Sequence, residues 1–280
     1  MTTMTASANV TDPGSIGAML RVWRQRRRLS QLELALEAGI SQRHLSFIES
    51  GRSVPGKDVV LRLAEQLNVP LRDRNPLLMA AGYAPMFAGR ALEDPGMAAA
   101  REAVGTILKG FEPHPALAVD RHWNMVDANG ALAILLAGVD PRLLEPPVNA
   151  LRVSLHPQGL APRIVNFGEW RRHVLARLAA QIEASADVSL KALEAELRGY
   201  PAATSREMAG VSGRSGAEGI AVPLRLQTEE GLLSFISTTT IFGTALDVTL
   251  SELAIEAFLP ADHETALRMA SLVPARTSSS

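Results

Sequence analysis

The sequence predicts two domains, a mainly α N-terminal domain of five short helices and an α+β C-terminal domain. The N-terminal prediction rests on five segments within residues 15–84 whose apolar residues recur at helical spacing, with capping residues and glycines between them. The C-terminal prediction rests on short strand-like runs mixed with longer helical segments after residue 100. With 280 residues, of which 47% are hydrophobic, the chain is long enough for two hydrophobic cores.

Composition excludes several classes of protein. The chain has no cysteine, which excludes disulfides, thiolate zinc sites and cysteine nucleophiles. No apolar run approaches the ~18 residues of a membrane span, and residues 1–14 lack the pattern of a signal peptide. We therefore expect a cytoplasmic protein without membrane contact. Residues 1–14 are expected to form a disordered leader, residues 85–99 a linker between domains at 15–84 and 100–273, and residues 274–280 a tail.

Capping residues define the helices of the N-terminal domain. Ser30 and Glu33 have the spacing of a capping box, in which each side chain accepts a hydrogen bond from the other residue's backbone. Gly39 suits the left-handed position that ends a helix, and Ser41 supplies the next N-cap. Gly56 precedes the fourth helix. The predicted helices are Ile16–Arg28, Gln31–Ala38, Gln42–Glu49, Lys57–Leu67 and Leu71–Ala81.

Strand and helix patterns share the C-terminal domain. Asn129 is expected to cap the first of its helices. Within the last predicted strand the apolar residues change parity near Ser251, which indicates a bulge or bend. The glycines of residues 210–219 match no phosphate-binding motif and predict a mobile loop. The predicted strands are Ala116–Val119, Trp123–Val126, Ile220–Leu226, Leu232–Thr240 and Asp247–Leu259; the predicted helices are Ala131–Leu136, Gly168–Ala184, Val188–Leu197 and Asp262–Leu272.

Basic residues concentrate in the N-terminal domain. The net charge is −1, but residues 15–90 hold twelve Arg or Lys against six Asp or Glu. This surplus fits a polyanionic partner, and on charge alone a solvated surface explains it equally well. In the third predicted helix, Gln42 and Arg43 face outward, where Gln can pair with adenine and Arg with guanine; other basic residues can meet phosphates. The candidate DNA-binding residues are Arg24, Arg28, Gln31, Ser41, Gln42, Arg43, His44, Ser46, Phe47, Arg52 and Lys57.

The spacing of Gln31, Ala35, Gly39, Leu45 and Ile48 resembles that of the lambda-repressor-like, or Xre, family of helix-turn-helix regulators. The resemblance extends over residues 20–82 and implies a five-helix domain that binds double-stranded DNA. Such domains usually carry a capping Ser at the position of Gly56, and glycine caps there at a small cost. We expect a homodimer on a palindromic operator with half-sites one helical turn, ~34–36 Å, apart.

The C-terminal domain resembles a second family. The run from Ala116 to Asn129 is similar to the opening of a PAS-like fold, and together with residues 149–152, 156–159 and 164–170 it resembles the MmyB-like ligand-binding domain. That resemblance implies a fatty-acid-like ligand, a small apolar acid. Such a site needs an apolar tunnel with a cation or several donors at its mouth. The candidate ligand-binding residues are Asn149, Arg152, His156, Arg163, Asn166, Trp170 and His173; Leu224, Leu226, Leu233, Phe235 and Ile241 either line the tunnel or form plain core.

The sequence offers no constellation for catalysis. It contains neither HExxH nor Gly-x-Ser-x-Gly, and the pair Glu169 and His173 is too small to hold a metal. We expect no enzyme, no metal and no cofactor apart from the fatty-acid-like ligand. Three hypotheses remain: a ligand-controlled transcriptional regulator, an antitoxin-like protein whose second domain binds a partner protein, and a constitutive DNA-binding protein whose second domain only dimerises.

Overall fold

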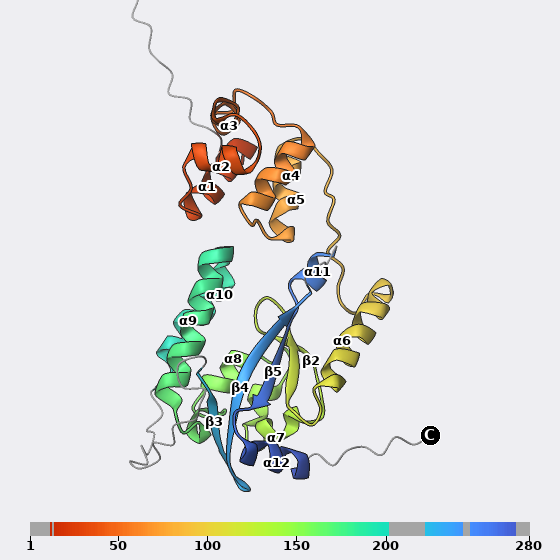
Figure 1. Ribbon diagram of the computed structural model, residues 1–280, viewed down its shortest axis with the longest axis vertical. Coiled ribbons are helices and arrows are strands. Elements are labelled where there is room, and N and C mark those ends of the chain that lie inside the picture. The colour runs from red at the N-terminus through yellow and green to blue at the C-terminus, as the bar shows by residue number, and fades with distance from the viewer. Residues whose placement is uncertain (1–11, 13, 202–221, 243–246, 273–280) are drawn as a thin grey trace, which may run out of the picture. The chain divides into compact units, whose positions relative to one another are not determined.

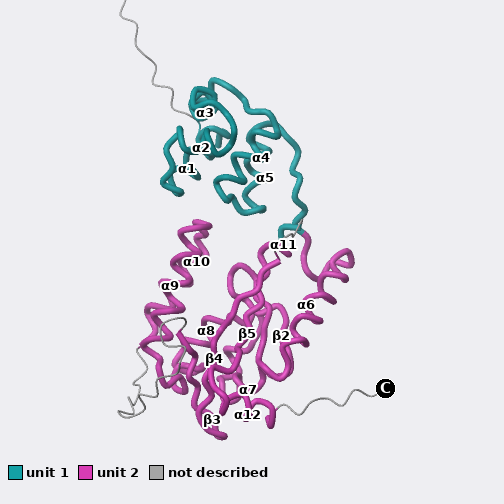
Figure 2. The backbone as a smooth tube through the Cα atoms, in the orientation of Figure 1, with its two compact units in different colours: residues 1–89, 246–248 teal, residues 90–245, 249–280 magenta. Residues whose placement is uncertain are grey.

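The computed structural model describes residues 12, 14–201, 222–242 and 247–272. The chain divides into two compact units, one formed by residues 1–89 and 246–248 and the other by residues 90–245 and 249–280 (Figure 2). Within the described residues each unit has its own hydrophobic core. The predicted leader, the glycine-rich loop at 210–219 and the tail fall almost wholly outside the described residues.

The N-terminal unit contains the five helices that the sequence predicts (Figure 1). Leu20, Leu34, Leu45, Ile48 and Leu63 are fully buried and form the centre of its core. These side chains come from four of the helices, so each amphipathic segment contributes one apolar face to a common interior. The helices are α1 Ile16–Arg26, α2 Gln31–Glu37, α3 Gln42–Glu49, α4 Lys57–Gln66 and α5 Leu71–Ala80.

The ends of these helices explain their short lengths. The capping box of Ser30 and Glu33 is confirmed, and the Ser41 hydroxyl accepts a hydrogen bond from the His44 amide at 3.1 Å. At the other ends the chain turns through a left-handed residue with a Schellman pattern of hydrogen bonds. After α3, for example, Gly51 has φ +74°, and the Arg52 amide donates to the Phe47 carbonyl at 2.8 Å. The left-handed residues are Arg28, Gly39, Gly51, Asn68 and Gly82.

Small residues let α1 and α2 approach α3 closely. A Cβ atom on Gly17 would lie 2.2 Å from the carbonyl oxygen of Ile48. Ala35 of α2 is buried, as predicted for a position that faces a neighbouring helix. The backbone of α3 is therefore held at short range from two sides, which fixes the orientation of its outer face.

The C-terminal unit is built on a five-stranded antiparallel sheet of order β2-β1-β5-β4-β3. In β5, Ile255 and Ala257 pack with α6 Ala98–Gly110 on one face, whereas Ala254 and Phe258 belong to the core on the other. That second core is completed by α7 Leu132–Leu136, α8 Ala150–Leu155, α9 Phe167–Ser185 and α10 Val188–Gly199, and α12 His263–Leu272 packs against β4 and β5 (Figure 1). The strands are β1 Ala116–Val119, β2 Met125–Ala128, β3 Leu224–Thr228, β4 Gly231–Ile241 and β5 Ala254–Pro260.

The last predicted strand is wrong in its first half. Residues Val248–Ser251 form the helical turn α11, and β5 begins only at Ala254. The amide of Glu252 donates to Thr249 O at 3.2 Å, and the amide of Leu253 donates to Leu250 O at 3.3 Å, so these backbone groups are satisfied locally. The change of parity near Ser251 therefore marks a passage from helix to strand and not a bulge.

Asn129 does not cap α7, which begins with Ala131 at the N-cap and has no side-chain cap. Its buried amide instead accepts a hydrogen bond from the Ala116 amide at 3.0 Å and donates to the carbonyls of Leu108 and His114. These backbone groups lie at the end of α6 and the start of β1, where neither helix nor sheet supplies all partners. Asn129 thus joins α6 to the sheet.

The remaining differences concern element ends and elements without a prediction. Trp123 has φ +67° and belongs to the turn, so β2 starts at Met125. Of the predicted strand 220–226, the first two residues lie outside the described part, and β3 starts at Leu224. Sequence patterning predicts neither α6 nor α8, nor the short 3-10 helices Pro95–Met97, Pro141–Leu144 and Ala161–Arg163.

Candidate DNA-binding face and ligand cavity

The third helix has the two faces that the sequence predicts. Leu45 and Ile48 are 0% exposed, whereas Gln42 and Arg43 are exposed at the N-terminal end of the same helix. Ser41 is exposed beside them, and His44 and Ser46 are half-buried. Because the buried face is locked in the core, the outer residues are presented on a rigid helix. This is the arrangement that reading of base edges in a major groove requires.

Phe47 and the outlying basic residues border this face. The Phe47 ring is half-buried and lies under two guanidinium groups, with the Cζ atoms of Arg43 and Arg52 at 5.3 and 5.9 Å from the ring centroid. Arg28, Arg52 and Lys57 are exposed. Exposure of this kind is what contacts with phosphate groups require.

Arg24 and Gln31, also predicted to contact DNA, turn toward a buried carboxylate. The Glu49 side chain is 0% exposed and accepts hydrogen bonds from Arg24 Nε and Nη2 at 2.7 and 2.8 Å and from Gln31 Nε2 at 2.9 Å. Arg24 also donates to the Leu29 carbonyl, and Arg21 donates to the Glu49 carbonyl. These bonds tie α1, α2 and the loop between them to α3.

Glu49 was not among the predicted functional residues. Burial alone would oppose its ionisation, but hydrogen bonds from Arg24 and Gln31 and the charges of Arg24 and Arg21 outweigh that effect and hold the pKa of the carboxyl below its usual range. The signal in the sequence is an acidic residue next to buried Ile48 in a domain with a basic surplus. A buried charge of this kind requires a buried partner.

Most polar residues predicted to bind ligand take part in the fold. Asn149 caps α8 through a hydrogen bond from the Arg152 amide at 3.2 Å and donates to the His122 carbonyl at 2.8 Å. Arg152 forms a bidentate pair with Glu196 at 2.8 Å. The amide of Asn166 joins α9 to β3, since it donates to Pro223 O at 2.8 Å and accepts from the Arg225 amide at 3.2 Å.

His156 also makes its contacts within the protein. Its Nδ1 accepts a hydrogen bond from the Gln158 amide at 3.1 Å, and its ring meets the edge of Tyr200 with centroids 4.9 Å apart. His173 stacks at a tilt on Trp170, with centroids 5.5 Å apart. Burial, aided by the charge of Arg177, lowers the pKa of His173, so this ring is mainly neutral at pH 7.

Trp170 is the predicted residue that borders an apolar cavity. This cavity has a volume of about 60 Å³ and lies between the sheet, α7, α8 and α9. Its one hydroxyl belongs to Ser154, which accepts a hydrogen bond from the Trp170 indole nitrogen at 2.9 Å. The remaining lining is apolar: Leu117, Met125, Leu132, Leu135, Leu136, Ala150, Val153, Leu160, Leu224 and Phe258.

Four of the five apolar strand residues predicted to line a tunnel or form core do one or the other. Leu224 lines the apolar cavity, and Leu226, Leu233 and Phe235 are buried core. Ile241 does neither, because 68% of its surface is exposed. Its prediction is wrong because β4 runs beyond its partner β3, which pairs only with residues 231–235.

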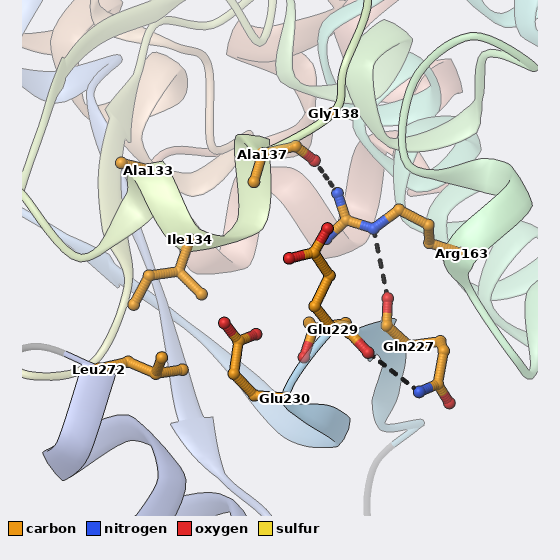
Figure 3. A pocket seen from close by; sticks show the side chains of 10 residues that line it. Ala133, Ile134, Ala137, Gly138, Arg163, Gln227, Glu229, Glu230 and Leu272 are labelled. Carbon is orange, nitrogen blue, oxygen red and sulfur yellow. Dashed lines mark hydrogen bonds between the residues drawn. The ribbon is translucent and has the colours of Figure 1, made fainter.

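The structure also contains a larger and more open hollow, of about 640 Å³, whose lining includes Arg163, Glu229 and Glu230 (Figure 3). Ala133, Ile134 and Ala137 of the α7 region line this hollow, whereas Leu132 and Leu135 of the same helix line the apolar cavity. Helix α7 is thus the wall between the two spaces.

Arg163, one of the basic residues predicted to bind ligand, lines this hollow. Arg163 donates to the carbonyl oxygens of Ala137 and Gln227, and burial lowers the pKa of its guanidinium. Glu229 and Glu230 line the same space. With two carboxylates against one guanidinium, the hollow offers little electrostatic attraction for an acid.

The described residues contain no group of three side chains able to hold a metal ion. The carboxylate of Glu169, which the sequence pairs with His173, accepts a hydrogen bond from the side chain of Asn166 at 3.0 Å. It thus has a partner within the protein. Across the same residues, no helix has both the length and the apolarity needed to cross a membrane.

Comparison with known proteins matches each unit to a family. Residues 20–73 match a helix-turn-helix model, and residues 100–272 match the MmyB-like transcription regulator ligand binding domain. The HTH-type transcriptional repressor RghR of Bacillus subtilis (strain 168) is 39% identical over 70 residues, which are 25% of this chain and 50% of RghR. The ImmF control region 10 kDa protein of Bacillus phage phi105 is 35% identical over 60 residues, 21% of this chain and 67% of that protein.

The chain thus spans about half the length of RghR, whereas the ligand-binding family covers more than half of the chain itself. Both families are families of transcription regulators and not of enzymes. The chain therefore belongs to the MmyB-like transcription regulators: it is a DNA-binding regulator in which a helix-turn-helix domain precedes a ligand-binding domain.

Proposed function

We propose that this regulator binds one palindromic operator in the cytoplasm as a homodimer, and that a fatty-acid-like molecule in the C-terminal unit controls that binding. The observation that carries the DNA part is the pairing of exposed Gln42 and Arg43 with fully buried Leu45 and Ile48 on α3. Arg and Gln supply the bidentate donors that distinguish guanine and adenine. Exposed Arg28, Arg52 and Lys57 supply phosphate contacts around them.

The apolar cavity beside Trp170 supports the ligand part. Its lining suits an acyl chain, and the described residues bring no ionised side chain to it. At about 60 Å³ it is far smaller than the ~300–1,000 Å³ of ordinary ligand sites. The ligand must therefore widen it, and displacement of α7 toward the larger hollow is the direction with free volume. A molecule that requires this displacement binds one conformation better than the other, which is what control of DNA binding demands.

The DNA part is tested by selection of duplexes from a random-sequence library with the full-length protein. We expect one two-fold symmetric sequence. On that duplex Arg43→Ala is expected to weaken binding by about 1–3 kcal/mol and to relax the preference at one base pair of each half-site. Arg198→Ala, which removes an exposed arginine of α10, is the control. Equal weakening on all sequences would make Arg43 a phosphate contact and contradict the assignment.

The ligand part is tested by native mass spectrometry of the full-length protein as purified, followed by denaturing extraction. We expect a bound acyl acid of defined mass that changes affinity for the selected duplex. Trp170→Phe, which alters the cavity lining, is expected to change the chain length that binds best. If the purified protein carries no small molecule and a series of saturated fatty acids leaves both its stability and its DNA affinity unchanged, the ligand proposal is wrong.

A further inference from the structure

The ring of Phe47 meets the guanidinium groups of two exposed arginines, which approach it from different parts of the chain. Arg43 lies four residues earlier on α3, and residues at this spacing share one face of a helix. Arg52 lies beyond the end of the helix. Its guanidinium is brought to the same ring, at 5.9 Å from the centroid.

The end of α3 explains how Arg52 returns to Phe47. Gly51 adopts φ +74°, and the amides of Arg52 and Ser53 both donate to the Phe47 carbonyl, at 2.8 and 3.2 Å. The Gly51 amide donates to the Ile48 carbonyl at 3.0 Å, which completes a Schellman motif. The backbone of Phe47 thus anchors the turn from which Arg52 reaches over the Phe47 ring.

Two guanidinium groups near one ring repel each other, so their placement there requires an attraction that offsets the repulsion. The π face of an aromatic ring supplies that attraction through its negative quadrupole, and arginine uses it more often than lysine. Phe47 is itself half-buried on the helix that also carries fully buried Ile48, so packing limits the positions that its ring can take. Contact with this ring restricts the rotamers of both arginines before DNA arrives, which reduces the entropy that binding must overcome.

We propose that Phe47 is a positioning residue that preorganises Arg43 and Arg52 as a pair for DNA. The sequence predicts that Phe47 itself contacts DNA. In the present proposal Phe47 acts instead through the two arginines. The proposal rests on the proposed function, because the pair meets DNA only if α3 does. Arg43 then contacts a base edge and Arg52 a phosphate of the same half-site.

The first test uses affinity for the duplex selected by the wild-type protein. Phe47→Leu keeps an apolar side chain but removes the ring, and we expect binding to weaken about five- to thirtyfold, the factor that two exposed cation–π contacts represent. Phe47→Tyr retains the ring and is expected to restore most of the affinity. Met79→Leu changes an exposed apolar residue of α5 and serves as the matched control, with no change expected.

A double-mutant cycle separates positioning from direct contact. If Phe47 acts through Arg43, Arg43→Ala costs less in the Phe47→Leu background than in the wild type, because the arginine has already lost its preorganisation. Independent, multiplying losses would overturn the proposal. Thermal unfolding of each variant shows whether a loss of affinity reflects a loss of fold.

The second test requires no DNA. In the free protein, the side-chain protons of Arg43 and Arg52 are expected to resonate upfield in NMR spectra because of the ring current of Phe47, and to return to ordinary positions in Phe47→Leu. Ordinary positions in the wild type would overturn the pairing even if the protein binds its operator. Failure to select any duplex would instead contradict the proposed function, and the NMR result would still decide the arrangement of the pair.

Discussion

The outer face of α3 and the predicted ligand-binding residues of the C-terminal unit differ in where their polar groups lie. On α3 of the N-terminal unit, Gln42 and Arg43 point away from the core and remain exposed. In the C-terminal unit, Asn149 bonds the start of α8 to the turn at His122, and Arg152 joins α8 to α10. A DNA-binding helix must expose the groups that recognise DNA, whereas a site for an apolar ligand is lined by the same residues as a core. Exposed polar residues therefore remain candidates for the first kind of site, whereas polar residues are a poor guide to the second.

The largest expected effect concerns the buried cluster around Glu49 in the N-terminal unit. Glu49→Gln removes the charge that faces Arg24, and we expect the unit to lose about 3–5 kcal/mol, the cost of breaking a buried pair from one side. Hydrogen–deuterium exchange of the full-length protein measures the loss in each unit separately. Amides of α1, α2 and α3 should exchange faster, and those of the sheet should not change.

Glu37→Gln is the matched control, since Glu37 is an exposed acid at the end of α2. It is expected to leave exchange in both units unchanged. Wild-type protection in Glu49→Gln would mean that the carboxylate does not hold the three helices together.

A second comparison uses one glycine in each unit. A Cβ on Gly17 would lie 2.2 Å from the Ile48 carbonyl oxygen, and a Cβ on Gly159 would lie 2.1 Å from that of Val153. Each Gly→Ala change is expected to cost about 1–3 kcal/mol, because backbone must move to admit the methyl group. Unit-resolved exchange should show each loss only in its own unit. A loss spread over both units would contradict the division into two separate cores.

Gly105→Ala provides the control for this pair. Gly105 lies within α6, and a Cβ there would meet no atom within 4 Å. Relief of the glycine's backbone entropy is expected to leave stability equal or raised by about 0.5–1 kcal/mol.

Acid is expected to destabilise the C-terminal unit first. Burial lowers the pKa of His114, whose Nδ1 has no hydrogen-bond partner among the described residues, and it also lowers the pKa of His173. The unfolded chain therefore binds more protons than the native one below the ordinary pKa of ~6.5, and stability falls as pH falls through that range. The slope is at most about 1.4 kcal/mol per pH unit for each histidine.

In the N-terminal unit the carboxylate of Glu49 makes stability depend on pH only at lower pH values. Its pKa is held below the ordinary 4.5, so its contribution is complete above 4.5 and is lost only as pH falls further. As the pH is lowered from 7.5 to 5, protection against exchange should thus weaken in the sheet before it weakens in α1–α3. The double substitution His114→Phe and His173→Phe should make the stability of the C-terminal unit depend less on pH. If the stability still falls as steeply with pH, these two rings are not its cause.

The smallest effect is expected at Arg152, which the sequence assigned to the ligand. Its pair with Glu196 is substantially exposed, so Arg152→Ala should cost at most about 1 kcal/mol. Ligand affinity should not change, because the arginine is not part of the cavity lining. A large loss of ligand binding with unchanged stability would show that Arg152 does bind the ligand. The two units would then differ less in how they use polar residues.

Local physics explains which features could be predicted from the sequence. Ser30, Glu33, Gly39 and Gly51 specify helix ends through their nearest neighbours, and all four act as their residue types suggest. The core of the N-terminal unit follows from helical spacing in the same way. Asn129 resembles a cap in its local sequence, but its hydrogen bonds are made with residues of α6 and β1.

The cavity was beyond prediction for a related reason. Leu117, Leu132 and Phe258 come together at it from two strands and a helix far apart in the chain. Nothing in their residue types distinguishes a cavity wall from close-packed core. Glu49 had a recognisable signal, since an acid at a buried helix position must have a cationic partner, but the choice of Arg24 among several arginines depends on how α1 packs on α3.

The position of the Glu49 cluster has a consequence for how such regulators diversify. Hydrogen bonds from Arg24 and Gln31 to Glu49 hold α3 against α1 and α2. Within the described residues, the side chains of Gln42, Arg43 and Ser46 contribute none of these bonds. In the function proposed above, substitutions at these three positions therefore change operator preference while the helix keeps its place. A duplicated copy of the chain could acquire a new set of target genes through surface changes alone, without passing through an unfolded intermediate in its evolution.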